Sequence, residues 1–172
     1  WQNLLAGQIA IQNIAAFDAS AFPCRIGAEA PPYKIGDHVP KSYRKGTKLM
    51  ARDIELAVIA ADDAFRNSGL KSPAYAEAAD IDGARFGCNI GAGLISAELN
   101  ELTASMHNAR DGNRLDLAKW GSGGMESLTP IWLLKYLPNM LACHVTIIHQ
   151  LKGPSNTLTC GEASSHLAIG EA

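Results

Sequence analysis

Residues 153–172 read "GPSNTLTCGEASSHLAIGEA", and this stretch decides the fold. The run Asn156 to Cys160 predicts a short buried strand, Gly161 predicts a sharp turn, and the small residues that follow predict a helix. Several enzyme folds hold a nucleophile on such a strand-to-helix elbow. The residue at the tip of this elbow is Glu162, and Cys160 stands two positions too early.

The rest of the chain alternates between helical and extended patterns, which predicts an α/β layered domain. Apolar residues recur at helical spacing over 49–68, and Gly69 closes that helix. In the first part of the chain we expect a helix at 1–7, a turn at 18–23, a strand at 24–29 and a basic surface segment at 31–48. In the later part we expect a strand at 84–93, a helix at 94–109 and a loop at 110–130. A helical stretch follows at 131–151, in which Pro138 begins a second piece.

Composition is that of an ordinary globular protein, with 172 residues, 47% hydrophobic residues and a net charge of −2. This charge argues against a general nucleic-acid binder. The four cysteines are too scattered for a C-x-x-C pair, so free thiols in a reducing cytoplasm are the simplest interpretation. The first 17 residues have no basic start and no unbroken apolar run, so we expect no targeting segment and no membrane span.

Two patterns resemble ligand motifs only superficially. "GCNIGAG" (87–93) follows a predicted strand, but it lacks both the dinucleotide-binding spacing and a P-loop lysine, so a close backbone crossing explains its glycines better. The histidines at 107, 144, 149 and 166 form no known metal-binding pattern, and we expect His144 and His149 to pack or to cap a helix. The sequence therefore predicts no metal and no cofactor.

A basic run precedes the long helix, at Lys41, Arg44, Lys45 and Lys48. Such a run is either a solvated face or a docking patch for an acidic partner, and the sequence leaves both open.

Glu162 stands where the elbow meets the helix. The positive end of the helix dipole there favours an ionised group and would equally activate a thiol. A carboxylate, however, cannot form the stable and reactive thioester that a thiolate forms. The pattern therefore combines a nucleophile's position with a residue that cannot do a thiolate's chemistry.

Three segments together resemble the β-ketoacyl synthases, also called 3-oxoacyl-acyl-carrier-protein synthases. They are "FDASAFPCRIGAEA" (17–30), "KLMARDIELAVIAADDAFRNSGL" (48–70) and "LPNMLACHVTIIHQLKGPSNTLTCGEASSHLAIGEA" (137–172). The resemblance covers essentially the whole chain. It implies the N-terminal half of a thiolase-like fold, a layered αβα half-domain spanning residues 1–172. It also implies a fragment that lacks the family's first strand and its C-terminal half.

The resemblance implies a role for particular residues. Counting forward from Gly153-Pro154, or backward from Ile169-Gly170, places the family's catalytic cysteine at Glu162, whereas Cys160 would need a two-residue slip. Leu137 falls at a position that lines the acyl pocket. Lys45 and Lys48 match family positions that contact the acyl carrier protein.

The resemblance also implies partners and a function, to which the sequence leaves alternatives open. Segment 133–149 corresponds to the family's dimer interface and acyl channel, which implies a homodimer or a heterodimer with a cysteine-bearing ketosynthase. By analogy with chain-length factors, the chain resembles a non-condensing partner subunit of fatty acid or polyketide synthesis. The alternatives are a malonyl decarboxylase or acyltransferase that uses Glu162, an active condensing enzyme that uses Cys160, and a truncated product without activity.

Overall fold

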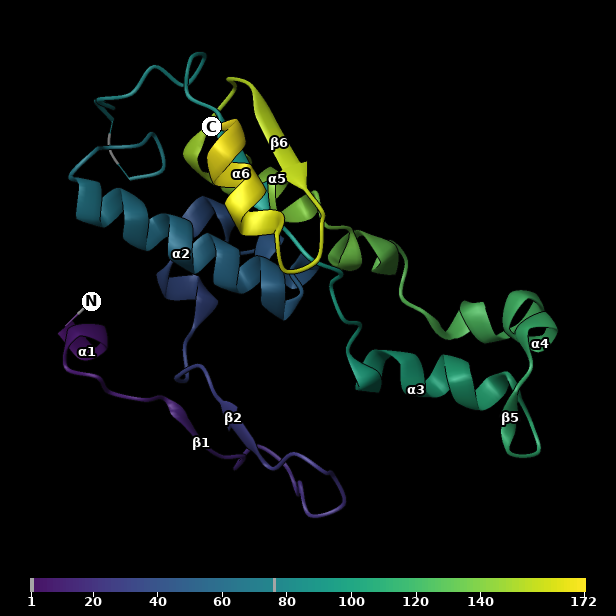
Figure 1. The fold of residues 1–172 in the computed structure, drawn as a ribbon. Coiled ribbons are helices and arrows are strands. Elements are labelled where there is room, and N and C mark those ends of the chain that lie inside the picture. The colour runs from purple at the N-terminus through teal and green to yellow at the C-terminus, as the bar shows by residue number, and fades with distance from the viewer. Residues whose placement is uncertain (1, 76) are drawn as a thin grey trace. The chain divides into compact units, whose positions relative to one another are not determined.

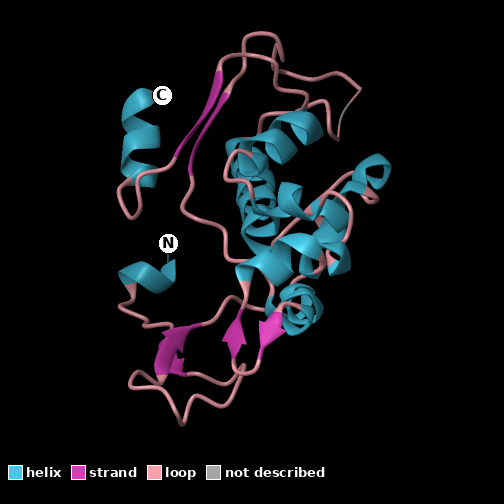
Figure 2. Cartoon of the chain, turned by 90° about the vertical axis from the view of Figure 1, so that its right-hand side faces the viewer, coloured by secondary structure: helices cyan, strands magenta, loops and turns pink. Residues whose placement is uncertain are grey.

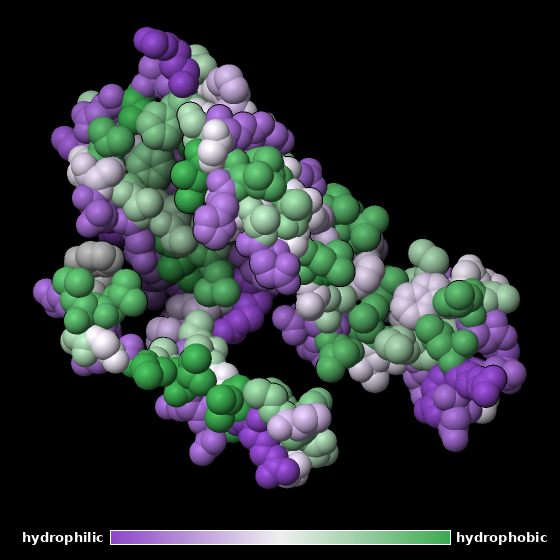
Figure 3. Space-filling view, viewed as in Figure 1, coloured by the Kyte–Doolittle hydropathy of each residue, from purple (hydrophilic) through white to green (hydrophobic). Residues whose placement is uncertain are grey.

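The structure is a computed structural model that describes residues 2–75 and 77–172. The chain forms two compact units, with the boundary after Lys34. In the first unit, α1 (Gln2–Leu5) precedes an antiparallel pair of strands, β1 (Ile11–Asn13) and β2 (Ile26–Ala28). The expected opening helix, turn and short strand are confirmed. Large apolar side chains of this unit are exposed, as the green surface along it in Figure 3 shows; they are Leu4, Leu5, Ile9, Ile11, Phe17, Phe22 and Ile26.

The second unit is built around two parallel strands, β3 (Cys88–Gly91) and β6 (Ser155–Leu158). Helix α6 (Ser164–Glu171) lies on one face of this pair, and α5 (Met140–His149) lies on the other (Figures 1 and 2). Helix α2 (Arg52–Ser68) packs against α5 and forms the outer layer. The predicted layered α/β class is confirmed.

Helix α2 is the long amphipathic helix that the apolar spacing predicts. It turns Ile54 and Val58 into the core, and Gly69 ends it with a left-handed φ of 74°, a conformation that favours glycine. It begins a few residues later than predicted because Met50 is extended, with φ −97° and ψ 131°.

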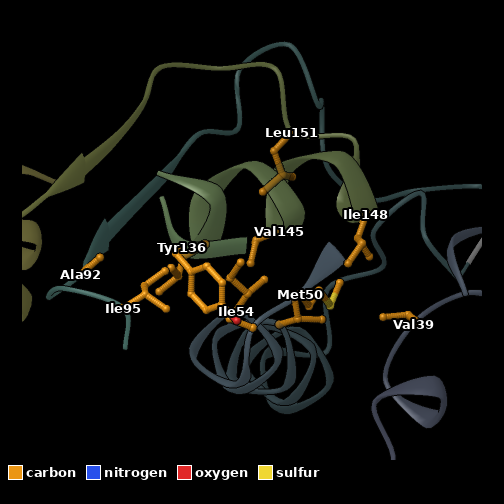
Figure 4. Packing of buried hydrophobic residues seen from close by; sticks show 12 residues of the cluster. Val39, Met50, Ile54, Ala92, Ile95, Tyr136, Val145, Ile148 and Leu151 are labelled. Atoms are coloured by element: carbon orange, nitrogen blue, oxygen red, sulfur yellow. The ribbon is translucent and has the colours of Figure 1, made fainter. Parts of the chain in front are cut away.

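The core lies between α2 and α5. In Figure 4, Val145 and Ile148 point from α5 towards Ile54 and Met50, and Tyr136 closes the cluster at one side. Ile54 is 0% exposed, so the helix–helix interface excludes water completely at that position.

Tight backbone crossings explain the glycines around the sheet. A Cβ on Gly91 would collide with the backbone of Ser164 at the start of α6, and one on Gly87 would collide with the carbonyl oxygen of Pro154. The glycines at the two ends of β3 therefore allow neighbouring backbone to approach closely, as the sequence predicted.

Two segments are more regular than predicted. Residues 31–48 are not a plain surface segment, because they contain three 3-10 helices, η1 (Ile35–Asp37), η2 (Lys41–Tyr43) and η3 (Gly46–Leu49), and bury Val39 in the core. The predicted loop 110–130 was also wrong. It contains the hairpin β4 (Arg110–Asp111) and β5 (Arg114–Leu115), then α4 (Leu117–Ser122) and η4 (Gly124–Ser127).

Capping explains the second of these differences. The Asp116 carboxylate accepts hydrogen bonds from the N–H groups of Ala118 and Lys119, which starts α4 within a glycine-rich sequence. Such a cap stabilises a helix that is too short to show a periodic pattern.

The remaining helices agree in type with the prediction. Helix α3 (Leu99–Asn108) begins later than its pattern suggested, and Pro138 separates η5 (Trp132–Tyr136) from α5. None of the helices within 2–75 and 77–172 has the length and apolar character needed to cross a membrane.

Candidate functional site at the strand-to-helix elbow

The elbow between β6 and α6 contains a left-handed residue, Gly161, with φ 50°. Side chains other than glycine rarely adopt this conformation, so the glycine permits the chain to reverse between strand and helix. Cys160 and Glu162, the residues on either side of it, form an isolated β-bridge. The left-handed residue of the elbow is therefore Gly161, and both candidate residues flank it.

Ser164 holds the elbow in shape. Its buried Oγ accepts a hydrogen bond from Cys160 N at 2.8 Å and lies 2.7 Å from the carbonyl oxygen of Gly161, to which it donates. The same hydroxyl lies 3.3 Å from the carbonyl oxygen of Ala92, which follows β3. A single buried hydroxyl thus ties the elbow to the neighbouring strand.

Both candidate side chains of the elbow are accessible. Cys160 is a free, exposed cysteine, and Glu162 is exposed at the turn before α6. Among the described residues the Glu162 carboxylate has no ion-pair partner within 4.0 Å. The elbow therefore presents a thiol and a carboxylate to solvent, and the structure brings these two candidates together.

The other predicted site residues lie on different elements. Leu137 is half-buried between η5 and α5. Lys45 immediately precedes η3, Lys48 lies within it, and both are exposed. Residues three apart eclipse in a 3-10 helix, so the two side chains start from the same side. Since η3 contacts η5, the lysine pair and Leu137 belong to neighbouring elements.

The two histidines expected to pack or cap are buried. The His144 Nδ1 lies 2.9 Å from the Tyr43 hydroxyl, and the His149 ring stacks on Phe65 with 4.2 Å between centroids. Burial lowers the pKa of both imidazoles. His149 also bonds the Ser72 hydroxyl at 2.7 Å.

Sequence reasoning missed a polar network on α2. Asp62 is fully buried and receives hydrogen bonds from His38 at 3.1 Å and from Arg66 at 3.0 Å. Burial, followed by the negative charge of Asp62, raises the pKa of nearby Tyr75 to about 12. The signal in the sequence was a charged residue on the apolar face of a predicted helix, which needs a buried partner.

A second missed network joins α3 to η5. The Glu101 carboxylate bonds the Lys135 ammonium and accepts from the Tyr136 hydroxyl at 2.7 Å. The bond from Lys135, then that from Tyr136, lowers the pKa of Glu101. No spacing rule connects these residues, because Lys135 and Tyr136 stand 34 and 35 positions after Glu101.

Comparison with known proteins places the chain in a family. The family model described as "Beta-ketoacyl synthase, N-terminal domain" matches residues 1–172, so the chain belongs to this family. It is 26% identical over 181 residues to 3-oxoacyl-[acyl-carrier-protein] synthase 2 of Vibrio cholerae. That match covers 100% of this chain but 38% of the Vibrio protein. The chain therefore spans well under half the length of this relative.

Solved structures of similar fold agree with this family assignment. A β-ketoacyl synthase from Burkholderia phymatum superimposes with a TM-score of 0.69 and 25% identity, covering 99% of this chain and 37% of that one. Two more distant structures share the fold. One is AntDE:AntF, a type II polyketide ketosynthase in complex with its acyl-carrier protein; it has a TM-score of 0.57 and 13% identity, and the match covers 83% of this chain and 35% of that one. The other is the ishigamide ketosynthase/chain length factor; it has a TM-score of 0.56 and 21% identity, and the match covers 92% of this chain and 34% of that one. The fold is that of a ketosynthase N-terminal domain, with the thiolase-like architecture that the sequence predicted.

Proposed function

We propose that this chain is the N-terminal part of a non-condensing ketosynthase homologue, which pairs with a cysteine-bearing ketosynthase and shapes its acyl tunnel in fatty acid or polyketide synthesis. The observation that carries the proposal is the elbow, where an exposed Glu162 follows the left-handed Gly161; the count along the sequence predicts that this residue stands at the register of the family's cysteine. A carboxylate at that position cannot hold an acyl chain as a reactive thioester. The two-directional count along the sequence supports the same register.

Acyl loading tests the proposal. Incubating the protein with a radiolabelled acyl-carrier-protein thioester should leave no stable label on the chain, and Glu162→Cys in the whole protein should create loading. Glu171→Cys, at the far end of α6, is the matched control and should not load.

One specific observation favours a second candidate, a condensing enzyme that uses Cys160. The Cys160 thiol is free, exposed and on the same turn as Glu162. Stable label on the unmodified protein that disappears in Cys160→Ala would establish this alternative and overturn the non-condensing role.

Acyl carrier protein is the proposed partner for Lys45 and Lys48. Carrier proteins are acidic, and complementary charge favours association. The solved AntDE:AntF complex shows that a ketosynthase of this fold binds a carrier protein. In support, both lysines are exposed, and their side chains start from the same side of η3.

Charge reversal separates docking from a solvated face. Lys45→Glu/Lys48→Glu should weaken carrier-protein binding markedly, and more at low salt than at moderate salt. Lys71→Glu/Lys152→Glu changes the net charge equally at two other exposed lysines and should leave binding unchanged. Equal affinity of the Lys45/Lys48 variant and the unmodified protein at low salt would remove the docking role.

Self-association or pairing through segment 133–158 is the remaining part of the proposal. The structure buries much of this segment within its own core, including Val145 and Ile148, and leaves Leu133 (60% exposed) and Ile147 (58% exposed) at the surface. Light scattering should detect a dimer, alone or with a sister ketosynthase. A monomer at high concentration that binds no ketosynthase would count against it.

A further inference from the structure

A histidine and two aspartates meet near the middle of the chain's long helix. The ligand atoms of His38, Asp62 and Asp63 all lie within 4.8 Å of one another. His38 follows η1, while the aspartates belong to α2, so the cluster joins two elements of the second unit. Ligand atoms around one ion with bonds of about 2.1 Å lie roughly 3–4 Å apart. Small side-chain rotations would therefore bring the three groups around a common ion.

The buried carboxylate supplies an independent observation. Asp62 is 0% exposed, and its Oδ2 receives the bonds from His38 and Arg66. Its Oδ1 is buried and has no hydrogen-bond partner among the described residues. A buried carboxylate oxygen without a donor is costly, so a cation beside this atom would be stabilising.

The hydroxyl of Tyr75, which also interacts with Asp62, bonds the backbone of His38. Tyr75 donates its only hydroxyl hydrogen to the main-chain carbonyl of His38 at 2.8 Å. The His38 N–H in turn donates to the carbonyl of Ile35 at 3.0 Å. The backbone of His38 is thereby held on both sides, which positions its ring beside Asp62 before any ligand arrives.

We propose that His38, Asp62 and Asp63 bind a first-row divalent transition-metal cation. One imidazole nitrogen and two carboxylates suit Mn²⁺, Fe²⁺ or Co²⁺ better than the all-oxygen sites of Mg²⁺ and Ca²⁺. Asp62 coordinates through Oδ1, while Arg66 keeps its bond to Oδ2, as partners of metal-binding carboxylates commonly do. His38 is 27% exposed on its side chain and Asp63 is exposed, so water reaches the remaining coordination positions.

This inference departs from the sequence, which predicted no metal. The histidines considered there did not include His38, and His38 stands 24 positions before Asp62. Spacing rules detect ligands that lie close in sequence, whereas this set depends on η1 packing beside α2.

The test uses Mn²⁺ as the probe, because the exposed thiols of Cys24 and Cys160 would capture Zn²⁺ elsewhere. The chelator-treated full chain is titrated with Mn²⁺ at about pH 7.5, and free Mn²⁺ is followed by its paramagnetic resonance signal. We expect one bound ion per chain. His38→Gln and Asp63→Asn should each weaken binding by at least about tenfold.

Asp53→Asn is the matched control, since Asp53 is exposed in the first turn of the same helix, outside the cluster. It should bind Mn²⁺ as the unmodified chain does. Both test variants change side chains that are at least partly exposed, and circular dichroism checks that they fold. Binding weaker than about 1 mM in the unmodified chain, or equal binding by His38→Gln and Asp63→Asn, would overturn the proposal.

Discussion

Helices α5 and α6 lie on opposite faces of the same strand pair, yet their surroundings differ. Helix α5 buries Leu141, Ala142, His144, Val145, Ile148 and His149, whereas α6 buries only Ser164 and Ala168 among its described residues. Helix α5 lies between the sheet and α2, so apolar neighbours surround it. Helix α6 forms an outer layer and carries the elbow at its start.

The two faces of the strand pair therefore differ in what they provide: one provides buried area and the other provides access to solvent. The face occupied by α5 provides the buried area that holds the second unit together, and even its histidines lie inside. The face occupied by α6 leaves the turn with Cys160 and Glu162 open to solvent. Such access is what the proposed role requires, because an acyl carrier protein would approach the elbow from outside.

The strongest test compares one isoleucine on each helix. Ile148 on α5 is 4% exposed, and Ile169 on α6 is 78% exposed. Ile148→Ala should lower the free energy of unfolding by about 2–5 kcal/mol, because it removes buried contacts and leaves a cavity. Ile169→Ala should change it by less than about 0.5 kcal/mol. Chemical denaturation measures both, and similar losses for the two variants would contradict the comparison.

A smaller effect is expected at the elbow. Gly161→Ala should destabilise the protein by about 1–2 kcal/mol, because alanine resists the left-handed φ of 50°. Apart from its chain neighbours, nothing lies within 4 Å of the added Cβ, so strain rather than crowding causes the loss. Gly170→Ala, which lies within α6 and also has free space, should instead be neutral or stabilising by about 0.5–1 kcal/mol. Thermal unfolding that shows the same sign for both variants would contradict the role of φ.

The buried histidines of α5 predict a pH dependence. Burial lowers the pKa of His144 and His149 in the folded state, so the unfolded chain binds more protons below its ordinary histidine pKa of about 6.5. Their contribution to stability is present above that value and is lost as the pH falls through the lowered pKa. Denaturation midpoints should therefore decrease from about pH 7.5 to 5.

His149→Gln should flatten this decrease, whereas His166→Gln, at an exposed position of α6, should leave it unchanged. An unfolding free energy with the same pH slope in all three proteins would show that the buried histidines do not cause it.

The smallest expected effect lies at the end of α6. Asn156 on β6 donates to the Glu171 carboxylate at 2.9 Å and 3.0 Å, and both residues are exposed. Asn156→Ala should lower stability by about 0.5 kcal/mol, since water replaces an exposed hydrogen bond easily. Asn100→Ala, at another exposed asparagine, is the control. A loss above about 2 kcal/mol would mean that α6 contributes more to stability than its exposure suggests.

Much of the fold follows from local patterns. The apolar spacing of α2 and the glycine after it predicted both the helix and its end, and Pro138 marked the division before α5. The elbow followed from Gly161 between an extended run and small residues. These features depend on neighbours a few positions apart, so a linear pattern contains them.

The segment 110–130 shows where local patterns fail. Its glycines suggested a loop, but Asp116 caps a short helix and Gly112 turns a two-residue hairpin with φ 58°. Elements of this length have no periodicity to detect. The burial of Val39 within a basic, proline-containing segment was likewise invisible until η1 and η2 packed beside the core.

The sequence by itself indicated the family and the order of the main helices and strands, and it led to the prediction that Glu162 stands at the position of the family's cysteine. Only the tertiary structure decided that His38 meets Asp62, that Ser72 bonds His149 77 positions away, and that Gly91 must accommodate the backbone of Ser164. The physical reason is that backbone preferences and amphipathic periods act over one or two turns, whereas these contacts form between distant segments. Burial of the apolar faces of α2 and α5 brings those segments together, and the chain order alone contains no measure of that distance.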